Sequence, residues 1–342
     1  MPIDNIKRTI HLRRRKNQRI MQNVARLWEL GKQAQSHQEL LEGLHPWGTD
    51  NQLRFDNVLP ILLAVIAGCC LLSIWILPAG LPSHLAFWLA LGLGFYSYLT
   101  YEQSSPIAEV IEFLEQQTIT QKYSFQFYQT PVHISMPVQP SLFQAYLKNL
   151  FPLFQQGQVS NTIPVYASTV WTDDQGQQYP VLLFQYHFVN EIRMRDRNGN
   201  ETKVKEVHKD LWGVFIFQVA AQGLAVTSSR KTFEFPYLHD WHTSDIQINQ
   251  KLRIFGANPL QLAKTLTPAM VLRLDQLFAT RSGDLLLHPE QPVLCFLGEQ
   301  DLFKISTKTQ NIDDISKLRG HLRTFRLAEY ENLQRDLIAF LK

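Results

Sequence analysis

Two long apolar runs dominate the pattern of hydrophobic and polar positions along this chain. Val58 to Leu77 reads VLPILLAVIAGCCLLSIWIL, and Leu85 to Tyr101 reads LAFWLALGLGFYSYLTY, with Pro78 and Gly80 in the turn between them. A helix rises about 1.5 Å per residue and the hydrocarbon core of a bilayer is about 30 Å thick, so roughly 20 apolar residues are needed to cross it. The pattern predicts a two-helix transmembrane hairpin over residues 58–101, with spans at 58–77 and 85–101. The alternative is a helical hairpin buried in a large protein core.

The distribution of charge supports the same prediction. The 342 residues include 33 Lys and Arg and 30 Asp and Glu, yet none of these lies among the 45 residues between Asp56 and Glu102. Ten Lys and Arg, against six Asp and Glu, precede the first apolar run. Because basic flanks tend to stay on the cytoplasmic side of a membrane, we expect both termini in the cytoplasm. The expected location is the bacterial inner (cell) membrane.

Residues 1–57 are interpreted as a basic amphipathic helical arm, because Ile20, Val24 and Leu27 recur at helical spacing. Anionic lipid headgroups attract clustered cations. Membrane-surface contact is therefore one hypothesis for a basic cluster in this arm, and an ordinary solvated helix face is the other. No nucleic-acid partner is expected, because the arm lacks a recognised binding motif. The cluster consists of Arg13, Arg14, Arg15, Lys16 and Arg19.

Residues 102–122 predict a helical stem after the hairpin. Pro106 follows two serines that can cap a helix, and Ile107, Val110 and Leu114 fall on one face. Four glutamates of the stem carry charge opposite to that of the arm. We therefore expect weak ion pairs between the stem and the arm.

The segment from Tyr123 to Trp171 contains Lys148 as its only Asp, Glu, Lys or Arg. An uncharged surface of this length indicates one of two arrangements. Either the segment lies against a membrane or a partner, or it belongs to an ordinary fold that is rich in glutamine.

The remaining pattern of residues 123–342 is typical of an α+β domain. A helix is predicted at 268–280 with Thr267 as its cap, a strand hairpin at 285–287 and 293–297, and one or two helices at 312–340. The predicted fold class is a cytoplasmic α+β domain, mainly an antiparallel sheet with helices, attached to a two-helix transmembrane hairpin. The expected strands, rich in β-branched and aromatic residues, are 163–171, 179–189, 211–219, 224–228 and 252–255.

Three segments, taken in order, resemble a known family. They are HKDLWGVFIFQVA, RIFGANPLQLAKTLTPAMVLRLDQL and LLLHPEQPVLCFLGEQDLFKIS, and the matching positions are Trp212, Gly213, Thr267, Pro268, Asp301, Leu302 and Phe303. The pattern is similar to that of the bacterial membrane-protein family of domain of unknown function 3137, over roughly residues 141–317 plus the hairpin. The resemblance implies no activity. It implies a LemA-like membrane protein as a partner, because family members are often encoded near such proteins.

Common catalytic motifs are missing from the sequence, which contains no G-x-S-x-G, P-loop, G-x-G-x-x-G, H-E-x-x-H or paired C-x-x-C. His239 and His242 have a spacing that suits two metal ligands on one helical turn, but no third ligand is identifiable. A surface turn anchored by Trp241 is the alternative. Cys295 lies in an apolar strand, where a buried thiol is inert. We therefore predict no catalytic residue, no metal and no cofactor.

Three functions are compatible with these patterns. The first is a non-catalytic binding or scaffold module that faces the cytoplasm and has the lipid bilayer as a partner. The second is a membrane-tethered enzyme of an unrecognised class, using the His and Asp residues of segment 239–245. The third is a homo-oligomer joined through the hairpins and stems.

Overall fold

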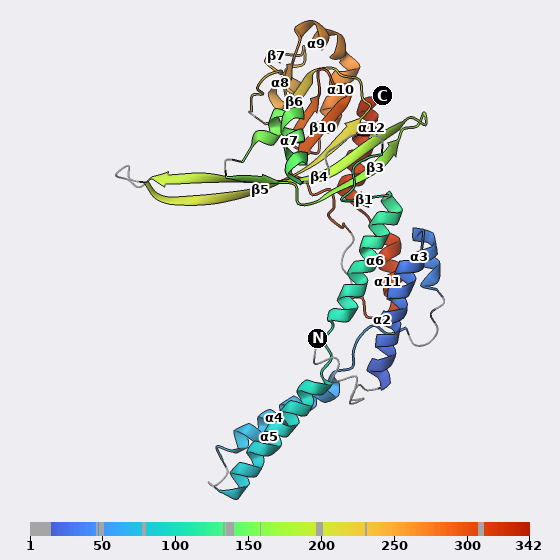
Figure 1. Ribbon diagram of the computed structural model, residues 1–342, viewed down its shortest axis with the longest axis vertical. Helices are drawn as coiled ribbons and strands as arrows, with labels where there is room; N and C mark the ends of the chain where they lie inside the picture. Colours follow the sequence, from blue (N-terminus) through green and yellow to red (C-terminus); the bar gives the residue numbers. More distant parts are fainter. Residues whose placement is uncertain are drawn as a thin grey trace. The chain divides into compact units, whose positions relative to one another are not determined.

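The computed structural model describes residues 15–45, 47, 51–76, 80–132, 134, 140–157, 159–195, 201–229, 231–306 and 311–342 (Figure 1). The chain divides into two compact units. Unit 1 comprises residues 1–122 and 307–325, and unit 2 comprises residues 123–306 and 326–342. The segment 307–325 therefore returns to the amino-terminal unit after the chain has formed most of unit 2.

Unit 1 is helical and has its own apolar core. Its helices outside the hairpin are α2 (Arg15–Gln33), α3 (His37–Gly43), α6 (Ser105–Tyr123) and α11 (Ile315–Thr324). Trp28 of α2 stacks on Phe113 of α6 with ring centroids 4.3 Å apart. The core residues, which include the stripe predicted for the arm, are Ile20, Val24, Leu27, Leu40, Leu44, Leu53, Phe55, Ile107, Val110, Leu114, Ile315, Leu318 and Leu322.

Apolar side chains make close contacts between α2 and α6 in the described part of unit 1. Gly31 lies so close to α6 that a Cβ atom there would be 2.5 Å from the Phe113 ring. Glu115 of α6 pairs with His321 of α11, with 2.6 Å between Oε1 and Nε2. Burial of the apolar stripes thus brings α2 and α6 together, and the pair between Glu115 and His321 joins α6 to α11.

The apolar runs form a pair of antiparallel helices, α4 (Val58–Ser73) and α5 (Leu81–Thr100), called the apolar hairpin below (Figure 1). Among the described residues, no helix has both the length and the apolar character needed to cross a membrane. With 16 residues, α4 measures about 24 Å. Although α5 has 20 residues, it contains Ser83, His84 and Thr100 as well as tyrosines. The prediction of a transmembrane hairpin is therefore wrong, and the inner-membrane location with transmembrane anchoring that was derived from it is not supported.

Unit 2 is built on an antiparallel sheet, as the sequence predicts, and the described part of the chain contributes ten strands to it. The strand order is β1-β3-β4-β5-β10-β9-β6-β8-β7, with β2 paired to β4. The strands are β1 (Gln126–Phe127), β2 (Ser160–Thr162), β3 (Tyr166–Thr172), β4 (Gln178–Arg195), β5 (Glu201–Phe217), β6 (Leu224–Thr227), β7 (His239–Trp241), β8 (Arg253–Gly256), β9 (Gly283–Leu287) and β10 (Val293–Gly298).

Helices cover both faces of this sheet. On one face, α7 (Pro140–Leu150) and the 3-10 helix η1 (Pro152–Gln155) place apolar side chains against β4, β5 and β10, and Phe151 stacks on Phe215. On the other face, α10 (Pro268–Phe278) and α12 (Ala328–Leu341) pack together. The indole of Trp171 in β3 donates a hydrogen bond of 3.0 Å to the Tyr330 hydroxyl of α12. The short helix α8 (Ile246–Lys251) connects β7 to β8, and α9 (Pro259–Thr265) follows β8 and leads to α10.

The uncharged segment 123–171 supplies much of this core. Phe143, Leu147, Phe151 and Phe154 are all buried against the sheet. Their burial accounts for part of the scarcity of charge in this segment, while Tyr128, Val132, Val159 and Val170 remain exposed. The cap predicted for α10 is also present, because Thr267 Oγ1 accepts a hydrogen bond from the amide of Met270.

The β4 and β5 strands continue beyond their neighbours as a long two-stranded ribbon (Figure 1). Their register runs from Val181 opposite Ile216 to Arg195 opposite Glu201. On one side β3 pairs with β4 as far as Phe184 and β2 pairs with it from His187 to Val189, and on the other side β10 pairs with β5 only as far as Trp212. Polar side chains can therefore face water on the outer part of the ribbon.

We expect Leu114→Ala to destabilise unit 1 by about 2–5 kcal/mol, because it leaves a cavity in the core that joins α2, α6 and α11. Hydrogen exchange measured at increasing urea concentrations gives the free energy of unfolding of each unit separately. The exposed Glu109 on the same helix provides a control, Glu109→Ala. An equal loss of stability in unit 2 would contradict the division into two units.

Candidate docking surface

The apolar hairpin leaves most of its large side chains exposed. Trp75 is 91% exposed and Ile76 is 87% exposed, whereas the buried hydrophobic residues of the two helices are Pro60, Ala67 and Ala90. Single exposed apolar residues are normal, but contiguous apolar patches indicate a binding surface. The exposed set from position 58 to 101 is Val58, Ile61, Leu62, Val65, Ile66, Leu71, Leu72, Trp75, Ile76, Leu81, Leu85, Phe87, Trp88, Leu89, Leu91, Phe95, Tyr96, Tyr98 and Tyr101.

These side chains are not confined to one stripe. Consecutive helical residues point about 100° apart. Ile61 and Leu62, Val65 and Ile66, and residues 87–89 are nevertheless all exposed. A helix that is apolar on all sides needs an apolar environment around it rather than a single groove beside it. The hairpin therefore presents apolar surface in several directions.

Aromatic side chains gather where α5 ends. Phe95, Tyr96, Tyr98 and Tyr101 are all exposed there. A hydrogen bond of 2.6 Å from the Ser97 hydroxyl to the Pro60 carbonyl places this end beside the start of α4. Tyrosine combines an apolar ring with a polar hydroxyl, and such side chains favour the boundary between an apolar phase and water.

Polar contacts fasten this end of the hairpin to itself and to α2. The Asn57 side chain donates to the Glu102 carbonyl at 2.8 Å and accepts from the Glu102 amide at 3.1 Å. Asn17 makes an equivalent pair of contacts with the backbone of Asp56, at 3.3 and 2.9 Å. Lys16 forms an ion pair of 3.7 Å with the Asp56 carboxylate. We call this polar end of the hairpin its base.

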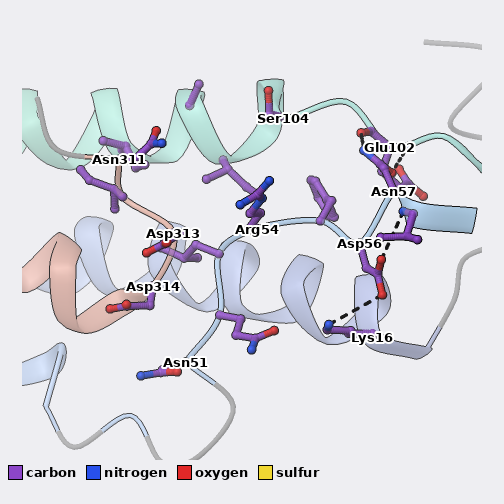
Figure 2. Close-up of a pocket in the computed structure, with 18 of the residues that line it drawn as sticks. Lys16, Asn51, Arg54, Asp56, Asn57, Glu102, Ser104, Asn311, Asp313 and Asp314 are labelled. Carbon is purple, nitrogen blue, oxygen red and sulfur yellow. Dashed lines mark hydrogen bonds and ion pairs between the residues drawn. The ribbon is translucent and has the colours of Figure 1, made fainter. Parts of the chain in front are cut away.

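A groove of about 960 Å³ lies at the base, and Figure 2 shows the side chains that line it. Its walls come from residues 51–58, the first turns of α6 and the segment before α11. The charged lining combines Lys16 and Arg54 with acidic side chains. Lys317 donates a hydrogen bond to Asp313, and this contact lowers the pKa of the Asp313 carboxyl. The groove is thus of mixed charge, and it lies next to the aromatic end of the hairpin.

The basic cluster predicted for membrane-surface contact is only partly described. Arg13 and Arg14 lie outside the described residues, and Arg15 begins α2. Lys16 lines the groove at the base, and Arg19 is exposed on α2. The part of the cluster that can be located therefore lies on the helix that contacts the base, and Lys16 is the member that lines the groove.

The positions that carry the family resemblance fall into two places in unit 2. Phe303 packs edge-on against Trp212 with centroids 5.7 Å apart, and Leu302 is buried. Asp301 accepts a hydrogen bond of 2.8 Å from the Phe303 amide, while burial raises the pKa of the Asp301 carboxyl.

The other matching positions lie elsewhere in unit 2. Thr267 and Pro268 begin α10. Gly213 is required by packing, since a Cβ atom would lie 2.3 Å from the Phe184 ring. These contacts contribute to the packing of unit 2 and to the start of α10.

Segment 239–245, whose His and Asp residues are the basis of the enzyme hypothesis, does not form a helical turn. His239 lies in strand β7, Asp240 pairs with Arg253 at 3.2 Å, and Asp245 caps α8. Across the described residues, no group of three or more His, Cys, Asp and Glu side chains could hold a metal ion. Cys295 is fully buried, and burial raises the pKa of its thiol. The prediction of a buried thiol is confirmed.

No family model, curated protein or solved structure matches this chain. The resemblance to the family of domain of unknown function 3137, and the LemA-like partner that it implies, therefore stay predictions.

We expect Asn57→Ala to loosen the base of the hairpin, because it removes both hydrogen bonds to the Glu102 backbone. Each bond contributes about 1 kcal/mol, so amide exchange at the start of α4 and the end of α5 should accelerate about tenfold or more. Hydrogen-exchange mass spectrometry measures this. Gln103→Ala changes the exposed neighbour and serves as the control; equal exchange in the two variants would show that Asn57 does not fasten the base.

Proposed function

We propose that this protein is a non-catalytic binding module that docks on a lipid layer through the apolar hairpin. The observation that supports the proposal is exposed apolar surface on several sides of α4 and α5. A protein partner with a single groove would cover one side of the hairpin. Fluid acyl chains can surround all sides, so a lipid layer is the occupant that best fits this distribution.

The order of side chains along the hairpin agrees with this proposal. Residues such as Ile76 and Leu81 lie near the turn, the aromatic group lies at the other end of α5, and Lys16 and Arg54 lie in the groove at the base. Exposed tyrosines next to charged residues at the base are suited to the headgroup region, and the apolar residues and Trp75 near the turn are suited to acyl chains. Docking of this kind requires insertion into one side of the layer and no helix that crosses it.

Electrostatic attraction is a second contribution. Basic residues near an anionic lipid surface each contribute about 1 kcal/mol, and this contribution weakens as salt increases. Lys16 and Arg19 lie on α2, which contacts the base of the hairpin through Asp56. The proposed docking should therefore be tighter on anionic vesicles than on neutral ones.

Unit 2 would then be the part that is presented at the lipid surface. Its described residues contain no cluster of three metal-ligating side chains, and the titratable groups of segment 239–245 are separated between a strand and a helix cap. We therefore propose a binding role for unit 2 rather than a catalytic one.

Vesicle flotation tests the proposal. The full chain should float with anionic phosphatidylglycerol vesicles, and less with neutral phosphatidylcholine vesicles. Leu62→Glu and Leu89→Glu place a charge on the exposed hairpin and should each weaken binding about tenfold or more, because charge is costly in an apolar phase. Leu260→Glu and Leu272→Glu are matched controls in unit 2, at side chains that are 75% and 61% exposed, and should leave binding unchanged.

Two outcomes would overturn the proposal. The first is equal flotation of the hairpin variants and the matched controls. The second is a stable oligomer in light scattering that does not bind vesicles and that the hairpin variants dissociate. That second outcome would assign the hairpin to contacts between copies of the chain.

A further inference from the structure

Two histidines meet on the ribbon formed by β4 and β5. In the register of the ribbon, His187 lies opposite Asp210 and Val189 lies opposite His208. Side chains two residues apart on a strand share a face, so His187 and His208 lie diagonally on one face of the ribbon. Their ring centroids are 5.4 Å apart, and His187 Nε2 lies 3.4 Å from His208 Nδ1.

The other nitrogen of each ring faces a carboxylate. His187 Nδ1 lies 2.8 Å from Asp210 Oδ1, and His208 Nε2 lies 3.7 Å from Glu206 Oε2. The Asp210 carboxylate also accepts a hydrogen bond of 2.8 Å from Gln185. As the acceptor in both contacts, the Asp210 carboxylate favours a proton on His187 Nδ1.

We propose that His187 and His208 together bind one divalent transition-metal ion of the zinc type through His187 Nε2 and His208 Nδ1. A zinc–nitrogen bond is about 2.0–2.1 Å long, so two tetrahedral ligands lie about 3.3–3.4 Å apart. The observed separation is 3.4 Å. Metal-binding histidines usually donate their second N–H to a carboxylate. His187 Nδ1 has Asp210 at hydrogen-bond distance, whereas the Glu206 carboxylate lies 3.7 Å from His208 Nε2.

A direct hydrogen bond between the rings fits the surroundings less well. If His208 Nδ1 carried the proton and donated it to His187, His208 Nε2 would present a lone pair to Glu206. Two acceptors would then face each other. With a metal ion between the rings, both protons lie on the outer nitrogens and each faces a carboxylate. That conflict applies to two neutral rings: a doubly protonated His208 would satisfy the same contacts without a metal ion, and zinc titration separates the two arrangements.

The surrounding charge also suits a cation. Glu191 lies opposite Glu206 in the register, and both are exposed on the same face as the two histidines. Like charges directly across a pair of strands are unfavourable, and a nearby cation reduces their repulsion. Two imidazoles leave two tetrahedral positions open for water or for a side chain of a partner.

Calorimetric titration of the untagged, chelator-treated full chain with ZnCl₂ tests the proposal. We expect one site, with His187→Gln and His208→Gln each weakening it more than tenfold. Asp210→Asn, which changes a positioning residue, should weaken it about 10–100-fold. His239→Gln and His242→Gln are matched controls on unit 2 and should bind zinc as the unchanged chain does.

A second measurement uses the unchanged chain, so it tests the proposal even if the variants fail to fold. Zinc should protect His187 and His208 of the unchanged chain from diethyl pyrocarbonate, as read by mass spectrometry, while His239 and His242 stay reactive. Equal protection of all four histidines would overturn the proposal, as would no protection of His187 and His208. Unchanged zinc binding in the His187→Gln and His208→Gln variants would also overturn the proposal.

Discussion

Removal of apolar side chains from water is the constraint on which both units of this protein depend. In unit 1 it holds α2, α3, α6 and α11 around one core. In unit 2 it holds α7 and η1 against β4, β5 and β10. The apolar hairpin is the described region where the same constraint is not satisfied within the chain, because most of its large side chains remain exposed. Our functional proposal follows from this contrast, since a contiguous exposed apolar surface indicates a binding site.

The register of β4 and β5 is the second organising feature. Within the sheet it places Gly213 against the Phe184 ring and brings Phe215 into the core. Beyond β3 and β10 the same register continues without an apolar core on its polar face, and there it brings together His187, His208 and Asp210. One pairing thus stabilises the fold and builds the proposed metal site, so the site is held by a regular strand pair rather than by a loop.

Local signals explain what the sequence predicted well. Thr267 with Pro268 begins α10 as expected, and each predicted strand overlaps a strand of the observed sheet, whereas the short strands β1, β2 and β7 were not predicted. The hairpin prediction went too far because an apolar count does not show that α4 ends at Ser73 or that polar residues dilute α5. Contacts distant in sequence were also missed. His187 and His208 are 21 residues apart, and only the strand register shows that they meet. The return of α11 to unit 1 likewise leaves no local signal.

Fluorescence quenching by brominated lipids tests the central claim most directly. Trp75 and Trp88 are both exposed on the apolar hairpin. In the presence of anionic vesicles, our account predicts a blue shift of the emission and quenching by lipids brominated along the acyl chain. The double variant Trp75→Phe and Trp88→Phe should lose most of this response, whereas its binding to vesicles should persist. Emission that is the same with and without vesicles, or quenching that is unchanged in the double variant, would contradict the claim that the hairpin enters the lipid layer.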